Sequence, residues 1–117
     1  MRNQATRPVA GSSFYVLLAL ADRERYGLGI VQEVERRTDG RVRLGPGTLY
    51  NTLKRLLADG AIEEVASDER DGEDDSRRNY YRITEAGRSV VEAEAERLAQ
   101  LVDVARDKEL LPTRPGS

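Results

Sequence analysis

The chain has 117 residues, a formal net charge of −2 at pH 7 and a sequence pI of about 5.3, which leaves room for one ordinary domain. The absence of cysteine and histidine excludes disulfides, thiolate nucleophiles, cysteine-ligated metals and the commonest general base. The longest apolar run, residues 16–21, is too short to cross a bilayer, and no secretory signal pattern opens the chain. We therefore expect a cytoplasmic protein without catalytic activity, metal, cofactor or membrane partner. Taken alone, the slight net acidity argues against a nucleic-acid partner.

The N-terminal part of the chain is predicted to form a flexible arm and a short helix. Residues 1–11 are polar and contain proline and glycine, which is typical of an unstructured terminus. Ser12 or Ser13 then offers a side-chain oxygen that can cap free backbone N–H groups. Apolar residues follow at helical spacing up to about Asp22. These residues are Phe14, Leu17, Leu18 and Ala21.

A second helix is predicted over residues 26–38, after a polar turn at residues 22–25. Its buried face is defined by small and apolar residues at helical spacing. These are Gly27, Ile30, Val31 and Val34. The charged residues are expected to face solvent on the other side. They are Glu33, Glu35, Arg36 and Arg37.

The next segment is predicted to hold a very short strand and a third helix. Residues 41–44 alternate between charged and apolar side chains, as in a half-buried strand. Pro46 suits the first turn of a helix, because its missing N–H would have no partner there. Gly60 suits the left-handed residue that follows a helix. Four leucines form one narrow stripe along this helix. They are Leu49, Leu53, Leu56 and Leu57.

Two further strands are predicted over residues 61–66 and 79–84. Side chains alternate between the two faces of a strand, and in the second strand Tyr81 and Ile83 share one face. The intervening residues 67–78 are too polar to bury. We therefore expect an antiparallel hairpin with a long, solvated tip.

Thr84 is predicted to cap a last helix that runs to about Leu110. Apolar residues follow one another at spacings typical of a helix–helix seam. The residues expected in a dimer interface are Val91, Ala95, Leu98, Leu101, Val102 and Ala105. The seam could instead pack on the core of its own chain. A helix of about 25 residues spans roughly 38 Å and overhangs so small a core, which favours dimerisation.

This order of elements indicates a mainly α fold with a small antiparallel β-hairpin. Three helices and a hairpin are the parts of a winged helix-turn-helix, in which two helices hold a third one rigid beside the hairpin. We expect this domain over residues 12–84, a C-terminal dimerisation helix over residues 85–111 and a tail over residues 112–117.

The third helix has a polar face opposite its leucine stripe. That face carries Thr48, Asn51, Lys54 and Arg55, and Tyr50 flanks the stripe within reach of the same face. Asparagine and arginine can read adenine and guanine edges, and the other three residue types commonly hold phosphates. Such a face could also be merely solvated. The charge distribution favours DNA, because residues 36–55 hold six basic side chains against one acid, a local net charge of +5.

Four segments of the chain form a recognisable set of motifs. They are RLGPGTLY at 43–50, LKRL at 53–56, DGAI at 59–62 and RNYYRITEAG at 78–87. In these segments the chain resembles the PadR family of transcriptional regulators. Residues 17–34 look like the first two helices of that family, and the likeness extends over about residues 13–106. The single C-terminal helix is similar to that of the compact branch of the family.

The resemblance implies a homodimeric repressor that binds pseudo-palindromic operators in double-stranded DNA and dimerises through its C-terminal helix. Some members of the family release DNA when a small molecule binds. The DNA-contacting candidates that the motifs suggest are Thr48, Tyr50, Asn51, Lys54, Arg55, Arg77 and Arg78, and the basic segment adds Arg41 and Arg43. By analogy of fold, an effector would lie near Phe14, Leu18 and Leu98.

The sequence departs from the family pattern in three places. The second helix begins with YGL at residues 26–28, where the family often has histidine, glycine and tyrosine, and Gly45 replaces a frequent serine before the proline. The segment 67–76 is strongly acidic, and carboxylates cannot approach phosphates favourably. We therefore expect only Arg77 and Arg78 of the wing to touch DNA.

Two other functions compete with DNA binding. The leucine-backed helix could serve a winged-helix protein-interaction module without specific DNA binding. The acidic tip could hold calcium, but an EF-hand loop starting at Asp68 would place Gly72 at a ligand position. The second alternative is therefore disfavoured.

Overall fold

The computed structural model describes residues 11–65 and 79–112. Its elements are α1 (Ser12–Leu20), β1 (Arg25–Tyr26), α2 (Gly27–Arg37), α3 (Pro46–Ala58), β2 (Ile62–Val65), β3 (Tyr80–Ile83) and α4 (Glu85–Asp107). Three predicted parts lie outside the described residues: the arm except for Gly11, the whole hairpin tip at residues 67–78 with Arg77 and Arg78, and the tail beyond Pro112.

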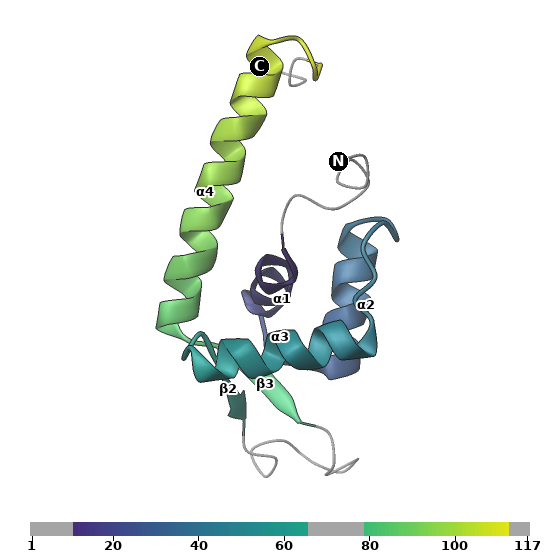
Figure 1. Cartoon of the computed structure of the whole chain (residues 1–117), viewed down its shortest axis with the longest axis vertical. Coiled ribbons are helices and arrows are strands. Elements are labelled where there is room, and N and C mark those ends of the chain that lie inside the picture. Colours follow the sequence, from purple (N-terminus) through teal and green to yellow (C-terminus); the bar gives the residue numbers. More distant parts are fainter. Residues whose placement is uncertain (1–10, 66–78, 113–117) are drawn as a thin grey trace.

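The elements form a small helical body with one long helix leaving it. In Figure 1, α1 lies between α2 and α4, and α3 crosses below them, next to the strands. The first part of α4 packs on α1 and β3, and the rest rises away from the body. The chain extends over 51 × 31 × 27 Å. The predicted fold class, mainly α with a small antiparallel sheet and a long C-terminal helix, is confirmed.

The sheet contains a strand that the sequence reasoning missed. This strand is β1, whose Arg25 and Tyr26 pair with Tyr81 and Tyr80 of β3. Arg25 was predicted to lie in the polar turn and Tyr26 to begin the second helix, which instead begins at Gly27. The other edge of β3 pairs with β2 in antiparallel register. The strand predicted at residues 41–44 is wrong, because this segment has no strand conformation. Both edges of β3 are already occupied, and the segment instead inserts Leu44 into the core.

The core lies between α1, α2 and α3. Its most deeply buried side chains are Val16, Leu17, Leu20 and Ile30. Of the apolar residues at helical spacing in α1, Leu17 is buried, whereas Leu18 is 47% exposed. The predicted outer face of α2 is wrong at Glu33, which is only 6% exposed. A charged side chain is therefore part of the interior, and its partners are described below.

Hydrogen bonds at the helix ends correct one prediction and confirm another. Gly11, not a serine, precedes α1 as its N-cap. Ser12 lies within the helix, and its hydroxyl shares a hydrogen bond of 2.9 Å with that of Thr52 in α3. Thr84 caps α4 as predicted, because its side-chain oxygen accepts a hydrogen bond from the Gly87 N–H at 3.1 Å. The first contact ties α1 to α3, and the second caps the start of α4 directly after β3.

The start of α4 is joined tightly to the end of α3. Gly60 has a φ of +75°, as expected of the glycine after a helix, and its carbonyl accepts a hydrogen bond of 2.6 Å from the Thr84 hydroxyl. A Cβ atom at Gly87 would lie only 2.1 Å from the carbonyl oxygen of Ala61. Arg88 donates to the carbonyl of Ala21 at 2.8 Å. The direction of α4 is therefore set by backbone contacts with α1 and the turn after α3.

No helix within residues 11–65 and 79–112 combines the length and apolar character needed to cross a membrane.

Candidate nucleic-acid interface

The inner side of α3 is held firmly by the core. Leu53 and Leu56 are buried, and Leu49 and Leu57 pack partly against the same cluster. Thr52 is 2% exposed, and its hydroxyl is satisfied by Ser12. The predicted leucine stripe is therefore confirmed as the inward side, with one polar residue added to it. A helix supported in this way can present its other side with little loss of conformational entropy on binding.

The outer side of α3 presents five polar or charged residues together. They are Thr48, Tyr50, Asn51, Lys54 and Arg55, and all five are exposed. The Lys54 Nζ lies 5.7 Å from the centroid of the Tyr50 ring, one helical turn away. The Arg55 guanidinium donates to the Ser13 hydroxyl at 3.2 Å. The structure thus brings these predicted residues onto one surface, which we call the α3 outer face.

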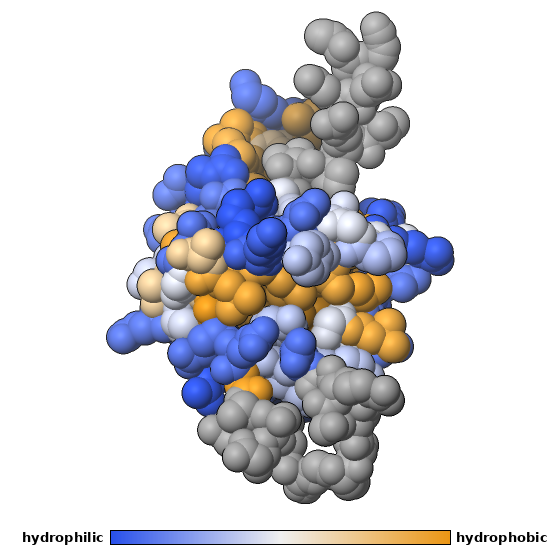
Figure 2. Space-filling view, turned by 60° about the horizontal axis from the view of Figure 1, so that its bottom comes forward, coloured by the Kyte–Doolittle hydropathy of each residue, from blue (hydrophilic) through white to orange (hydrophobic). Residues whose placement is uncertain are grey.

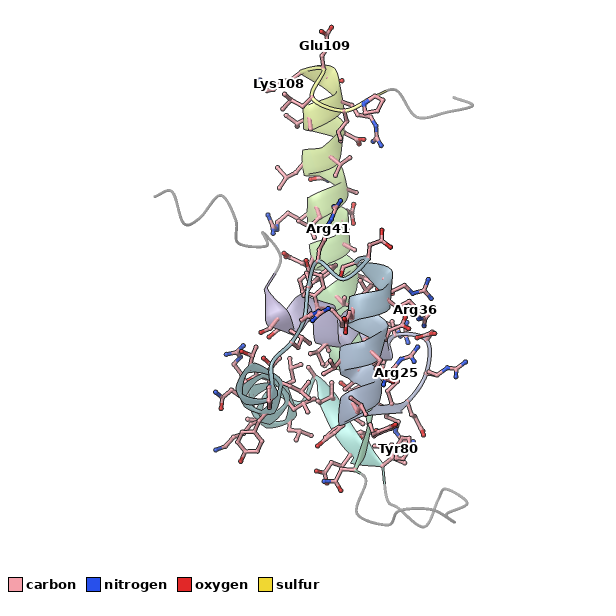
Figure 3. The ribbon with its side chains drawn as sticks, turned by 90° about the vertical axis from the view of Figure 1, so that its right-hand side faces the viewer. Arg25, Arg36, Arg41, Tyr80, Lys108 and Glu109 are labelled. Atoms are coloured by element: carbon pink, nitrogen blue, oxygen red, sulfur yellow. The ribbon has the colours of Figure 1, made fainter. Side chains whose placement is uncertain are left out.

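The remaining cations of the basic segment do not join the α3 outer face. Arg41 lies beyond the end of α2, well away from the end-on helix α3 in Figure 3. Arg43 is 73% exposed but forms an ion pair of 3.0 Å with Glu35. Arg36 and Arg37 both bind Glu33. The local net charge of +5 is therefore spread over several surfaces.

The described part of the wing is not basic. Arg82 of β3 forms ion pairs with Glu63 at 2.8 Å and with Glu24 at 3.6 Å. Next to this pair, Glu64 is also exposed. Figure 2 shows the lower side of the molecule, where hydrophilic groups border a band of hydrophobic surface. The paired Arg82 and the exposed Glu64 thus give the described residues of β2 and β3 no excess of positive charge.

The buried carboxylate of Glu33 is the centre of an arginine cluster that the sequence reasoning missed. It accepts hydrogen bonds from Arg36 and, at 2.9 Å, from Arg37, and Arg25 lies 3.5 Å away. The hydrogen bond from Arg37 is the main cause that lowers the pKa of Glu33, and the positive charges of Arg25 and Arg36 act in the same direction. The signal was present in the sequence as arginines three and four residues after the glutamate.

A pocket of about 450 Å³ lies between α1 and α2. Of the predicted effector residues it includes Leu18, but neither Phe14 nor Leu98 lines it. Phe14 packs partly against the core, and Leu98 is half-buried on α4. Within the described residues, no group of acidic side chains could hold a metal ion.

The predicted dimer residues fall into two sets. Val91 is only 5% exposed and belongs to the core of its own chain, so its assignment to a dimer interface is wrong. Farther along α4, Leu101, Val102 and Val104 are 50%, 39% and 47% exposed. Ala95 is exposed, and Leu98 and Ala105 are half-buried. The outer part of α4 thus has an apolar surface that the protomer leaves open.

The arrangement of three helices, a supported α3 and an adjoining antiparallel sheet defines a winged-helix protein. The transcriptional regulator PadR-like family matches residues 16–93, and the chain belongs to this family. Its members are transcriptional regulators rather than enzymes, so the expectation of a non-enzymatic protein is confirmed.

Individual relatives agree with this assignment. The chain is 37% identical to the transcriptional regulator Rv3488 of Mycobacterium tuberculosis over 92 residues, which are 79% of each chain. A transcriptional regulator from Clostridium thermocellum superposes with a TM-score of 0.68 at 27% identity, over 82% of this chain and 90% of the other. A PadR family regulator from Clostridium difficile has a TM-score of 0.69 at 24% identity, over 81% and 94% of the two chains, and supports the fold.

Proposed function

We propose that this protein is a homodimeric repressor that reads a pseudo-palindromic operator in double-stranded DNA with α3. The observation that carries the proposal is the two-sided character of this helix. Its leucines and Thr52 are held in the core, while five side chains that can bind DNA are exposed together on the α3 outer face. A rigid helix of this kind fits the major groove.

The α3 outer face divides into base-reading and phosphate-holding groups. Asn51 can make two hydrogen bonds to adenine, and Arg55 can make two to guanine. The bond from Arg55 to Ser13 holds the guanidinium near the surface before DNA arrives. Lys54, Thr48 and Tyr50 suit phosphate oxygens. Arg41 is left out of the proposed surface because it lies away from α3.

The proposed dimer joins two chains through the outer part of α4. Leu101, Val102 and Val104 supply its apolar contacts, and Leu98 and Ala105 flank them. Burial of these apolar side chains favours association, and part of the free energy gained offsets the entropy that the two chains lose on binding. Two copies of α3 would then read half-sites about one helical turn of DNA, roughly 34 Å, apart. Occupation of a promoter by this dimer would repress transcription, and a small-molecule effector would release it.

A selection of bound sequences from a random DNA pool tests the proposal. We expect a pseudo-palindromic consensus, and fluorescence anisotropy with that DNA should give a dimeric complex. Asn51→Ala should relax the preference at one position of each half-site, since the lost base contact is worth about 1–3 kcal/mol of discrimination. Gln32→Ala removes an exposed amide from α2 and should leave the base preference unchanged. Binding without any sequence preference would instead favour a protein-interaction module.

A further inference from the structure

The pocket between α1 and the later part of α2 has the size and lining of a small-molecule site. Its volume of about 450 Å³ falls in the usual range for such sites. Tyr15, Leu18 and Ala19 of α1 face Val34 of α2 across it. Leu18 is 47% exposed at this position, so the protomer leaves a large apolar side chain uncovered. The walls suit the apolar body of an organic ligand.

The charged groups that line the polar end of the pocket are Asp22, Glu33 and Arg37. Both carboxylates are already engaged by arginine. Asp22 pairs with Arg25, and Glu33 pairs with Arg25, Arg36 and Arg37. Among the charged lining groups, Arg37 is therefore the one left to meet a charged ligand.

Arg37 still has hydrogen-bonding capacity toward a ligand. Its Nε is used by Glu33 at 2.9 Å, but within the described part of the chain its two terminal nitrogens have no partner. The side chain is 65% exposed and lines the pocket. Two adjacent N–H groups of this kind match the two oxygens of a carboxylate or sulfonate.

We propose that this pocket binds a small organic anion. The apolar body of the ligand lies against Leu18 and Val34, and its carboxylate or sulfonate is held by the terminal nitrogens of Arg37. The site differs from the effector site predicted from sequence, because neither Phe14 nor Leu98 takes part in it.

Arg25 links the walls of the pocket to the sheet. Its Nε donates to the carbonyl of Ala19 at 2.7 Å, and its guanidinium lies 3.3 Å from Asp22 and 3.5 Å from Glu33. Arg25 belongs to β1 and pairs with Tyr81 of β3. Figure 3 shows Arg25 beside α2, above Tyr80 of the same sheet. A ligand that displaces the pocket walls would displace this strand, and Arg25 is thus a positioning residue for the wing.

Two fluorescent probes with similar aromatic bodies test the site in the absence of DNA. Anilinonaphthalene sulfonate carries an anionic group, and N-phenylnaphthylamine lacks it. In the full chain, Arg37→Met should weaken binding of the sulfonate by about fivefold or more, because one charged hydrogen-bonding partner is lost. It should change binding of the uncharged probe less than about twofold, since the apolar walls remain. Leu18→Asp should weaken both probes.

Arg97→Met is the matched control for the arginine variant. Arg97 is 52% exposed and pairs with Glu94 on its own helix, as Arg37 pairs with Glu33, but it lies outside the pocket. Its replacement should change neither probe, and thermal unfolding should show that all variants fold. Equal loss of both probes in Arg37→Met, or loss of neither, would overturn anion recognition. Dissociation of a dimer by Leu18→Asp with unchanged probe binding would show that a second copy covers the groove.

The link to the wing rests on the proposed DNA-binding function and has its own measurement. Saturating sulfonate probe should change the dissociation constant for operator DNA by about threefold or more. Arg25→Lys should abolish this change while each binary complex still forms. Specific DNA binding with the same dissociation constant in the presence and absence of the probe would overturn the coupling. A chain that binds no specific DNA would contradict the proposed function and the coupling together, while the probe titrations still decide the site.

Discussion

Lys54 and Tyr50 form a cation–π pair on the α3 outer face, with the ammonium nitrogen 5.7 Å from the ring centroid. Tyr50 is 63% exposed, so the pair is open to solvent and contributes little to the stability of the fold. Its effect is to hold a flexible cation close to the helix surface. A lysine restrained in this way loses less side-chain entropy when it meets a phosphate.

Replacing Lys54 with Ala should therefore weaken binding to all DNA sequences by a similar factor. The loss of one phosphate contact should also reduce the slope of log K against log salt by about one unit. Titrations at several salt concentrations measure both effects. Lys108→Ala, at the far end of α4, is the matched control and should leave the slope unchanged. A change of base preference in Lys54→Ala, at constant slope, would contradict a phosphate role.

Gly87→Ala should destabilise the fold. The added methyl group would lie 2.1 Å from the Ala61 carbonyl oxygen, so the backbone must move, and overpacking of this kind costs about 1–3 kcal/mol. Gly47→Ala offers the matched comparison, because that helical glycine has no neighbour within 4 Å of a new Cβ. It should be neutral or stabilising by up to about 1 kcal/mol. Urea unfolding of both variants measures the difference, and equal stabilities would refute the close approach at Gly87.

The buried Glu33 should give the protein an acid-sensitive stability. Its pKa is lower in the folded chain than the ordinary value of 4.5, so its charge stabilises the fold above pH 4.5 or so. That contribution is lost as the pH falls through the lower folded-state pKa. Glu33→Gln should cost about 1–3 kcal/mol at neutral pH, and its stability should depend less on pH in the acid range.

Denaturant unfolding at a series of pH values measures this effect. Glu92→Gln is the control, because Glu92 is an exposed residue of α4 and forms no ion pair within the described chain. It should keep the pH dependence of the parent protein. An acid profile of Glu33→Gln that coincides with the parent profile would rule out Glu33 as its source.

Leu101→Glu should dissociate the proposed dimer without unfolding the protomer. Leu101 is 50% exposed on the outer part of α4, so a charge is tolerated in the single chain but must be desolvated in an interface. Analytical ultracentrifugation should show a monomer, and circular dichroism an unchanged fold. Gln100→Glu introduces the same charge on the neighbouring residue, at another angle of the helix. Retention of the dimer by Leu101→Glu would argue for assembly through a different surface.

Val91→Ala should behave in the opposite way. Val91 is 5% exposed in the protomer core, so the smaller side chain should lower the free energy of unfolding by about 1–3 kcal/mol. Sedimentation of the folded fraction should show the same oligomer as the parent chain. A stable Val91→Ala protein that has lost its partner would return this residue to the dimer interface.

The fold was predictable where side-chain patterns repeat over several turns. The leucine stripe of α3 identified its inner side, and Thr84 marked the start of α4. The pattern failed where a contact came from elsewhere in the chain. A strand of two residues is too short to show the alternation of side chains that identifies strands in a sequence. Arg25 and Tyr26 could therefore not be recognised as a strand without their partner β3.

The candidate site was predictable to a similar extent. The α3 outer face follows from helical geometry, because four of its residues lie opposite the leucines and Tyr50 flanks them. Glu33 was misplaced because charged residues usually face water, and burial here depends on arginines that include the distant Arg25. Val91 and Leu98 belong to the same apolar seam of the sequence. The structure alone shows that the packing of α4 on the helical body buries Val91 in the core and leaves the later part of the seam open.

The hydrogen bond from Thr84 to Gly60 has a consequence for the architecture of the proposed complex. It joins the C-terminal end of α3 to the N-terminal end of α4. The close approach of Gly87 to Ala61 restricts movement at this junction. The angle between the two helices is therefore set by these contacts at their junction. In the proposed dimer, this junction sets the distance between the two copies of α3. A change at the junction would therefore select an operator with a different spacing between its half-sites, while every base contact stays the same.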